Sequence, residues 1–181
     1  MLPSVPSPLR IALLATLPFA LGACATSAPV SGTTMGAASL MTSDGQPAGT
    51  VTVRDRDGAT FLTIDARNIP AGPHGFHLHE TGTCDAPDFK SSGGHLNPTG
   101  ETHGVLSPGG KHLGDLPNLM ADADGTGSIT VALPGMPDML RAQIFDADGT
   151  AVIIHAEADD YRTDPTGAAG ARIACGVLEA R

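Results

Sequence analysis

The sequence predicts an all-β domain of short strands, arranged as a sandwich or a small barrel. In several short runs, apolar and polar residues alternate with a period of two, as in half-buried strands. Glycine and proline are abundant, at 23 and 15 of 181 residues, whereas aromatic residues make up only 3%. This composition favours many turns and short strands over long helices.

The strand-like runs follow one another from about residue 36 onward, and no segment shows the apolar stripe of a helix. The clearest runs are 51–54, 62–66, 129–133 and 151–154. Asp-Gly pairs, which favour the positive φ angles of tight hairpins, punctuate them at 44–45, 57–58, 124–125 and 148–149. Residues 80 to about 125 break this rhythm and are rich in Gly, Pro, His and Asp. A loop of this length in a compact domain is normally functional.

The formal net charge of −9 makes nucleic acid a poor partner, because binding it requires a basic surface. An anionic substrate would need a local positive charge to approach so acidic a chain. The apolar content of 41% argues against a disordered chain.

The first 23 residues read as an export signal, with Arg10 before a short apolar stretch at 11–20. Leu21-Gly22-Ala23-Cys24 resembles a bacterial lipoprotein box, in which Cys24 would carry the lipid. We therefore expect a signal peptide over 1–23, a flexible tether over 24–35 and one domain over 36–181, anchored at the periplasmic cell envelope. Two alternatives stay open: ordinary cleavage after Ala25, and an uncleaved segment in which Cys24 is inert.

Six of the seven histidines are candidate metal ligands. His77 and His79 sit two positions apart at the end of an apolar run, so on a strand both imidazoles would point to one face. Two imidazoles suit copper or zinc, although a His-x-His pair alone is more often incidental. A second set, capable of a tetrahedral zinc site, comprises His95, His103, His112 and Asp115. For this set, a solvated polar loop is the competing interpretation, and His155, alone after an apolar strand, depends on the others.

Taken together, these segments resemble the copper/zinc superoxide dismutase family in order and spacing over about 145 residues. The matching segments are Gly75–Glu80 (GFHLHE), Gly93–Pro98 (GGHLNP), His103-Gly104, His112–Leu116 (HLGDL), His155–Asp160 (HAEADD) and Gly170–Val177 (GARIACGV). The resemblance implies an eight-stranded Greek-key β-barrel, or flattened immunoglobulin-like sandwich, with long metal-binding loops.

The resemblance also implies the roles of individual residues. Copper would be held by His77, His79, His95 and His155, and zinc by His95, His103, His112 and Asp115. His95 would bridge the two ions, Asp159 would link a copper histidine to a zinc histidine, and Arg172 would attract and position the anion. Cys84 and Cys175 match the family's intrasubunit disulfide, whereas His74 matches a structural histidine.

The activity that the resemblance implies is disproportionation of superoxide to dioxygen and hydrogen peroxide, with copper cycling between Cu(II) and Cu(I). The segment between Asp160 and Arg172 is shorter than in the animal enzymes, with Pro165 in place of a steering lysine. Lys90 or Lys111 could supply the missing charge.

A non-catalytic envelope protein that binds copper and zinc is the alternative function. The Asp-x-Asp-Gly segments at 122 and 146 lack the other ligands of a calcium loop. The oligomeric state stays open, a homodimer being one option.

Overall fold

The computed structural model describes residues 32–181, so the expected signal, Cys24 and residues 25–31 of the expected tether lie outside the described part. The strands are β1 (Thr33–Thr42), β2 (Pro47–Arg56), β3 (Ala59–Ala66), β4 (Gly72–His74), β5 (Phe76–His79), β6 (Leu119–Ala121), β7 (Gly127–Leu133), β8 (Ala151–His155), β9 (Arg172–Val177) and β10 (Glu179–Ala180). Two short helices, η1 (Lys90–Ser92) and α1 (Pro137–Ile144), complete the fold. Within 32–181, neither helix is long and apolar enough to cross a bilayer.

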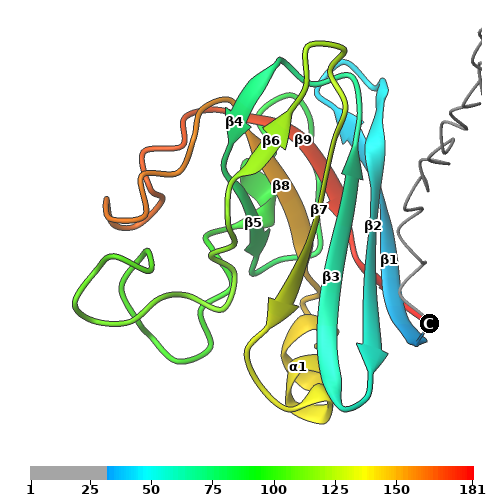
Figure 1. Ribbon diagram of the computed structural model, residues 1–181, viewed down its shortest axis with the longest axis vertical. Helices are drawn as coiled ribbons and strands as arrows, with labels where there is room; N and C mark the ends of the chain where they lie inside the picture. The colour runs from blue at the N-terminus through cyan, green and yellow to red at the C-terminus, as the bar shows by residue number, and fades with distance from the viewer. Residues whose placement is uncertain (1–31) are drawn as a thin grey trace, which may run out of the picture.

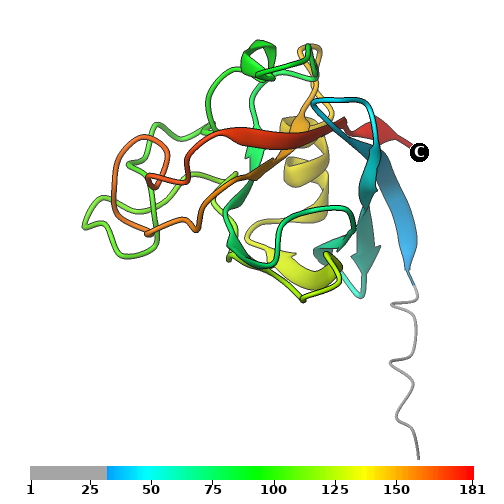
Figure 2. The ribbon, with the colours of Figure 1, turned by 90° about the horizontal axis from the view of Figure 1, so that it is seen from above.

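The prediction of an all-β fold is confirmed. The main sheet has eight strands in the order β5-β8-β9-β1-β2-β3-β7, with β10 paired to β1, and β4 and β6 form a second, two-stranded sheet. Neighbouring strands are antiparallel throughout. The main sheet curls into a half-barrel (Figures 1 and 2). Spatial neighbours that are distant in the chain, such as β3 with β7 and β5 with β8, give the long connections of a Greek key.

The core lies inside the curl, and the period-two pattern explains its register. Val51 pairs with Ile64 and Val53 with Leu62, and all four side chains are fully buried. A strand sends alternate side chains to opposite faces, so this register lines one face with apolar groups.

Helix α1 is an element that the sequence pattern did not predict. It has eight residues and begins with Pro137, whose fixed φ suits the first helical turn. Only Leu140 and Ile144, one turn apart, are buried. A stripe of two residues is too short to show as a helical period, so the helix depends on packing against the core at one end of the sheet (Figure 1).

The domain begins earlier than the sequence indicated. Strand β1 starts at Thr33, so residues 33–35 of the expected tether belong to the sheet. Met35 is buried in the core, and its sulfur accepts a hydrogen bond from Thr60. The residues here are small and polar, so the sequence showed no apolar alternation that would indicate a strand. The strand forms because it pairs with β2.

The Asp-Gly pairs lie in turns, but only two of the four close hairpins. Gly45 and Gly58 adopt positive φ angles of 81° and 76° between β1 and β2 and between β2 and β3. The pair at 124–125 joins strands of different sheets, and the pair at 148–149 leads from α1 into β8.

Two long connections extend from the same side of the curled sheet. Figures 1 and 2 show the segment after β5, in green, beside the segment between β8 and β9, in orange. Backbone N–H of Leu106 donates to the carbonyl of Tyr161 (3.1 Å), and that of His103 donates to the Asp164 carboxylate (2.7 Å). The candidate metal ligands lie where these connections meet the sheet.

Candidate metal centre

Strands β5 and β8 position three of the histidines. His77 and His79 are fully buried on β5, and the alternate residues Phe76 and Leu78 belong to the apolar core. His77 pairs with Ile153 of β8, and His155 ends that strand. The same-face arrangement expected for the His-x-His pair is therefore present.

Two backbone hydrogen bonds attach the long loop to the middle of β5, and a third joins the two attached parts of the loop to each other. Leu78 N–H donates to Gly114 O (3.0 Å), Gly114 N–H to Leu96 O (2.9 Å), and Leu96 N–H to Leu78 O (2.8 Å). A Cβ on Gly114 would lie 2.2 Å from the Leu78 oxygen, so only glycine allows this approach. The contacts place His95 and Asp115 opposite His79 and His77.

The first cluster, here the four-histidine group, comprises His77, His79, His95 and His155. One ring nitrogen of each faces the others, and these atoms lie within 4.8 Å of one another. The opposite nitrogens are anchored: His79 Nδ1 donates to Gly93 O (3.0 Å) and His155 Nδ1 to Gly170 O (3.2 Å). A nitrogen that donates to a carbonyl carries the proton, so the inward nitrogen presents its lone pair.

The second cluster, here the His3Asp group, comprises His95, His103, His112 and Asp115, whose ligand atoms also lie within 4.8 Å of one another. Asp115 Oδ1 lies 2.8 Å from His95 Nδ1 and 3.0 Å from the Nδ1 atoms of His103 and His112. Its other oxygen accepts backbone N–H bonds from Gly104 (2.8 Å) and His112 (3.0 Å). These two bonds aim Oδ1 at the three imidazoles.

The side-chain nitrogen and oxygen atoms of the two clusters are arranged to bind metal ions rather than to form hydrogen bonds with one another. Five inward nitrogens are buried without a hydrogen-bond partner among the described residues: His77 Nδ1, His79 Nε2, His95 Nε2, His103 Nδ1 and His155 Nε2. His103 Nδ1 lies 3.0 Å from Asp115 Oδ1, but this contact does not form a hydrogen bond. Buried polar atoms are rarely left unpaired, and a lone pair facing an ion accounts for them. In a tetrahedral zinc site with bonds of about 2.0–2.1 Å, ligand atoms lie about 3.3 Å apart. The separations of 2.8 to 3.5 Å in the His3Asp group match this geometry.

His95 belongs to both clusters, and Asp159 connects them by binding the outward nitrogens of one histidine from each. His95 turns Nδ1 toward Asp115 and Nε2 toward the four-histidine group. Asp159 accepts from His77 Nε2 (2.8 Å) through one oxygen and from His103 Nε2 (3.0 Å) through the other. Such partners fix the orientation and tautomer of metal-binding imidazoles. The backbone of Asp159 is itself held by the Asn118 side chain, at 2.8 and 2.9 Å.

The electrostatic environment favours neutral imidazoles and ionised carboxylates, the forms that bind metals. Burial lowers the pKa of His79 to about 2 and that of His155 to about 3. Burial also lowers the pKa of His95 to about 4, although the hydrogen bond to Asp115 opposes the change. Burial alone would raise the pKa of Asp115, but hydrogen bonds from His95 and the Gly104 N–H hold it well below the usual range.

Arg172 begins β9, paired with His155 across the sheet. Its Nη1 donates to Phe89 O (2.7 Å) and Ser92 Oγ (3.0 Å), and Nη2 donates to Gly93 O (2.7 Å). Gly93 O therefore receives bonds from both Arg172 and His79. Because the guanidinium charge lies this close, it contributes to lowering the pKa values of His79 and His155.

The disulfide that the family resemblance implies is confirmed. Cys84 and Cys175 are bonded, with Cα atoms 5.8 Å apart. The bond joins the first part of the long loop to β9, three residues beyond Arg172.

The two lysines considered for substrate steering differ in their surroundings. The Lys90 side chain is 81% exposed and pairs with Asp88 at 2.9 Å. Lys111 is half-buried and donates to the carbonyl of Asp115 (2.7 Å), so it supports the His3Asp group. His74 joins neither cluster, because both of its ring nitrogens face backbone carbonyls at 2.8 Å.

Sequence reasoning missed several supporting residues. Ser92, Asn118 and the carbonyls of Phe89 and Gly93 fix Arg172, Asp159 or His79 through contacts between distant segments. No spacing or motif marks such residues. All four residues lie in the long segment over 80–125 that the sequence marks as functional, and Gly93 begins one of the matching segments, but neither signal assigns them a partner.

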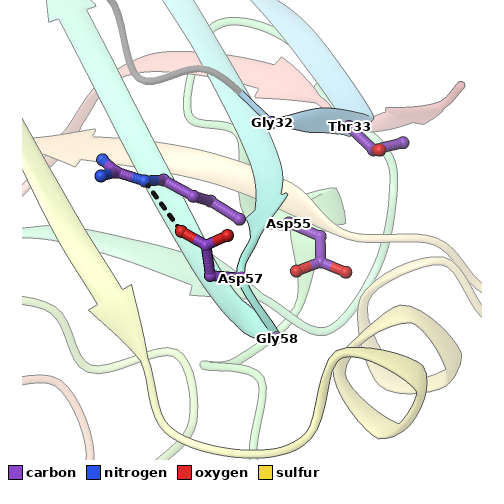
Figure 3. Close-up of a pocket in the computed structure, with 6 residues that line it drawn as sticks. Gly32, Thr33, Asp55, Asp57 and Gly58 are labelled. Atoms are coloured by element: carbon purple, nitrogen blue, oxygen red, sulfur yellow. Dashed lines mark ion pairs between the residues drawn. The ribbon is translucent and has the colours of Figure 1, made fainter.

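A separate surface pocket lies at the turn between β2 and β3, where β1 begins (Figure 3). It is lined by Gly32, Thr33, Asp55, Arg56, Asp57 and Gly58, none of which belongs to either cluster. Its one ion pair joins Arg56 and Asp57 at 3.5 Å, with both side chains largely exposed. An exposed ion pair of this kind contributes little to stability, and none of the residues that line the pocket belongs to a group able to hold a metal ion. The metal clusters are therefore the candidate functional site.

Comparisons with known proteins identify the family. Residues 47–178 match the family described as copper/zinc superoxide dismutase (SODC). A "Superoxide dismutase [Cu-Zn]" of Caulobacter vibrioides is 42% identical over 142 residues, which is 75% of this chain and 80% of that protein. "Superoxide dismutase [Cu-Zn] 1" of Aquifex aeolicus is 39% identical, over 78% of this chain and 86% of that protein.

Solved structures agree. A SOD-like protein from Bacillus subtilis superposes with a TM-score of 0.74 at 38% identity, covering 81% of this chain and all of that one. The Cu/Zn superoxide dismutase from Brucella abortus gives 0.64 at 30% identity, covering 79% of this chain and 98% of that one. By family, relatives and donor geometry, this chain belongs to the copper/zinc superoxide dismutases, oxidoreductases whose cofactors are copper and zinc.

Proposed function

We propose that the four-histidine group holds copper, that the His3Asp group holds zinc, and that the protein disproportionates superoxide at the copper side. The reaction consumes two superoxide anions and two protons and yields one dioxygen and one hydrogen peroxide. The observation that carries the proposal is His95, which offers one ring nitrogen to each cluster. The Arg172 guanidinium lies close to the four-histidine group, since it shares the Gly93 carbonyl with His79. When bound, copper supplies one-electron redox chemistry, whereas zinc is redox-inert.

His95 is suited to deliver one of the two protons. Its Nδ1 points into the His3Asp group and would be held there as a zinc ligand, so the ring would keep its orientation while Nε2 gains or loses a proton. A proton held at Nε2 would face the four-histidine group, where peroxide forms, and water would supply the second proton. Burial of the ring keeps bulk water from competing for this transfer.

Arg172 is suited to bind the superoxide anion. With a net charge of −9, the chain repels anions at long range, so attraction must come from a local positive charge. The hydrogen bonds to Phe89, Ser92 and Gly93 use three of the five guanidinium N–H donors. Two donors have no acceptor among residues 32–181 and are left for an anion.

The test is a superoxide dismutation assay on residues 25–181, purified with the disulfide intact and loaded with copper and zinc. Activity that depends on copper and is inhibited by cyanide would support the proposal. Stoichiometric binding of both metals without activity would instead favour the non-catalytic, metal-binding alternative. Arg172→Ala should bind both metals normally and lose most of the rate at low ionic strength, and an unchanged rate would exclude the role proposed for Arg172.

We also propose that the protein acts at the cell envelope, where it removes superoxide outside the cytoplasm. The export signal over 1–23 supports this location, and so does the disulfide, because such bonds persist in oxidising compartments. Fractionation of cells expressing the full chain tests the location. Mass spectrometry of the mature N-terminus should show a lipid on Cys24, whereas a chain that begins at Thr26 would indicate ordinary cleavage and no anchor.

A further inference from the structure

Ser92 is the only described side chain that accepts a hydrogen bond from the Arg172 guanidinium. The other two acceptors, Phe89 O and Gly93 O, are backbone atoms that any residue would provide. The Ser92 hydroxyl lies 3.0 Å from Nη1, so Nη1 is shared between Ser92 and Phe89 O. The amino acid at position 92 therefore decides whether one of the three contacts exists.

The hydroxyl of Ser92 is held in the orientation that this contact requires. Ser92 is fully buried, and its Oγ donates to Phe89 O at 2.9 Å. With its proton directed at Phe89, Ser92 presents lone pairs to Arg172. Because the residue is buried, water is poorly placed to replace the oxygen if it is removed.

The segment around Ser92 is rigidly attached to the sheet. Phe89 is buried in a small apolar cluster with Ala151, Ile153 and Cys175. The carbonyl of Ser92 accepts from the N–H of Thr81 (3.1 Å), just beyond β5. Ser92 is thus a fixed point, whereas Arg172 is a long side chain with several rotamers of similar energy.

We propose that Ser92 is a positioning residue, which holds the Arg172 guanidinium in the orientation that binds an anion at the copper side. The inference deepens the proposed function, because the anion is the superoxide that Arg172 is proposed to bind. Without the hydroxyl, Nη1 loses one acceptor in a half-buried place, and rotamers that turn the guanidinium away gain population.

The test measures binding of azide, a small anion that coordinates Cu(II), to the protein loaded with copper and zinc, by the change in Cu(II) absorption. Ser92→Ala should weaken azide binding by about three- to tenfold, the net contribution of one ordinary hydrogen bond, because the lost bond acts on azide only through the orientation of Arg172. Ser92→Thr keeps the hydroxyl and should restore the affinity. Metal content and the Cu(II) EPR spectrum without azide should match the parent protein in every variant.

Ser91→Ala is the matched control. Ser91 Oγ accepts from the N–H of Asp85 (2.8 Å) in the same loop but accepts no hydrogen bond from Arg172. This variant should leave azide affinity within about twofold of the parent, since an effect through loop stability alone would appear in both serine variants.

A double variant separates positioning from other effects. If Ser92 acts through Arg172, adding Ser92→Ala to Arg172→Ala should cause no further loss of azide affinity. Unchanged affinity in Ser92→Ala, or an equal loss in the Arg172→Ala background, would overturn the inference. Both outcomes are measured without turnover. A parent protein that binds azide but lacks dismutase activity would contradict the proposed function, and the azide affinities of the variants would still test the role of Ser92.

Discussion

The two metal clusters are built in different ways. In the four-histidine group, three of the four imidazoles come from β5 and β8, whose register sets their spacing. In the His3Asp group, all four ligands come from the connection between β5 and β6, in a segment without regular secondary structure. The first cluster is therefore positioned by the sheet, whereas the second depends on loop hydrogen bonds and on Asp115.

This difference predicts different responses to losing the metal. Removing copper should leave the strand histidines in place, because the ladders around them are unchanged. Removing zinc should loosen residues 99–114, whose backbone is tied to the domain by few hydrogen bonds. Under the proposed assignment, zinc would act as a structural ion for the loop and as a partner of His95.

The disulfide should give the largest effect on stability, because it ties the loop on the copper side to β9. Replacing Cys84 and Cys175 together by serine should lower the free energy of unfolding by up to about 4 to 5 kcal/mol, the loop-closure value for a separation of 91 residues. Denaturant unfolding of oxidised protein and of the variant measures this. The zinc content at neutral pH should change less than the azide affinity, and a greater loss of zinc would contradict the comparison.

Asp115→Ala should abolish the organisation of the His3Asp group. Loss of a supporting partner lowers metal affinity by about 10–100-fold, so loss of a ligand that also fixes three imidazoles should exceed about 100-fold for zinc. Amide hydrogen exchange over 99–114 should rise. His79→Ala is the counterpart on the sheet, and it should weaken copper binding while leaving exchange in that segment unchanged. Equal exchange in both variants would show that the loop does not depend on zinc.

Asp159→Asn should affect the two clusters unequally. The amide keeps one acceptor oxygen, so either His77 or His103 loses its partner. His77 is fixed by β5 but His103 lies in the loop, so we expect zinc affinity to fall by about 10–100-fold and copper affinity to fall less. Competition titrations with chelators measure both. A larger loss of copper would reverse the ranking.

Acid should destabilise the metal-free protein. Burial lowers the pKa values of His79, His155 and His95 to about 2, 3 and 4, below the 6.5 of the unfolded chain. Between pH 6.5 and 4 the unfolded state binds more protons, so stability falls as pH falls, by up to about 1.4 kcal/mol per pH unit for each of the three histidines. Below this window, protonation of Asp115 acts in the same direction.

Thermal unfolding in the presence of a chelator, followed from pH 7.5 to 4.5, measures this dependence. Protein loaded with zinc and copper is the control and should keep its melting temperature over more of the range, because bound metal holds the histidines unprotonated. A metal-free melting temperature that is constant from pH 7 to 5 would show that the histidines are hydrated, and the clusters open, before metal binds.

Replacing the two lysines should have the smallest effects, one on the reaction rate and the other on zinc affinity. Lys90→Ala removes an exposed charge near the loop that holds Arg172, so the rate should fall about two- to threefold at low ionic strength and recover at high salt. Lys111→Ala removes the hydrogen bond to the Asp115 carbonyl, and its effect should be weaker zinc binding that salt does not reverse. The reverse assignment would indicate that anions approach from the zinc side.

The strand runs at 51–54, 62–66, 129–133 and 151–154, the candidate metal ligands and the family could all be predicted from the sequence. Alternation at 51–54 and 62–66 is a local property of a half-buried strand, and the His-x-His spacing places 77 and 79 on one face in any strand. The tertiary structure alone decided where β1 begins, that α1 forms, and that Ser92 meets Arg172. These features depend on contacts between segments far apart in the chain, such as Met35 with Thr60, and a short local pattern carries no signal of such a partner.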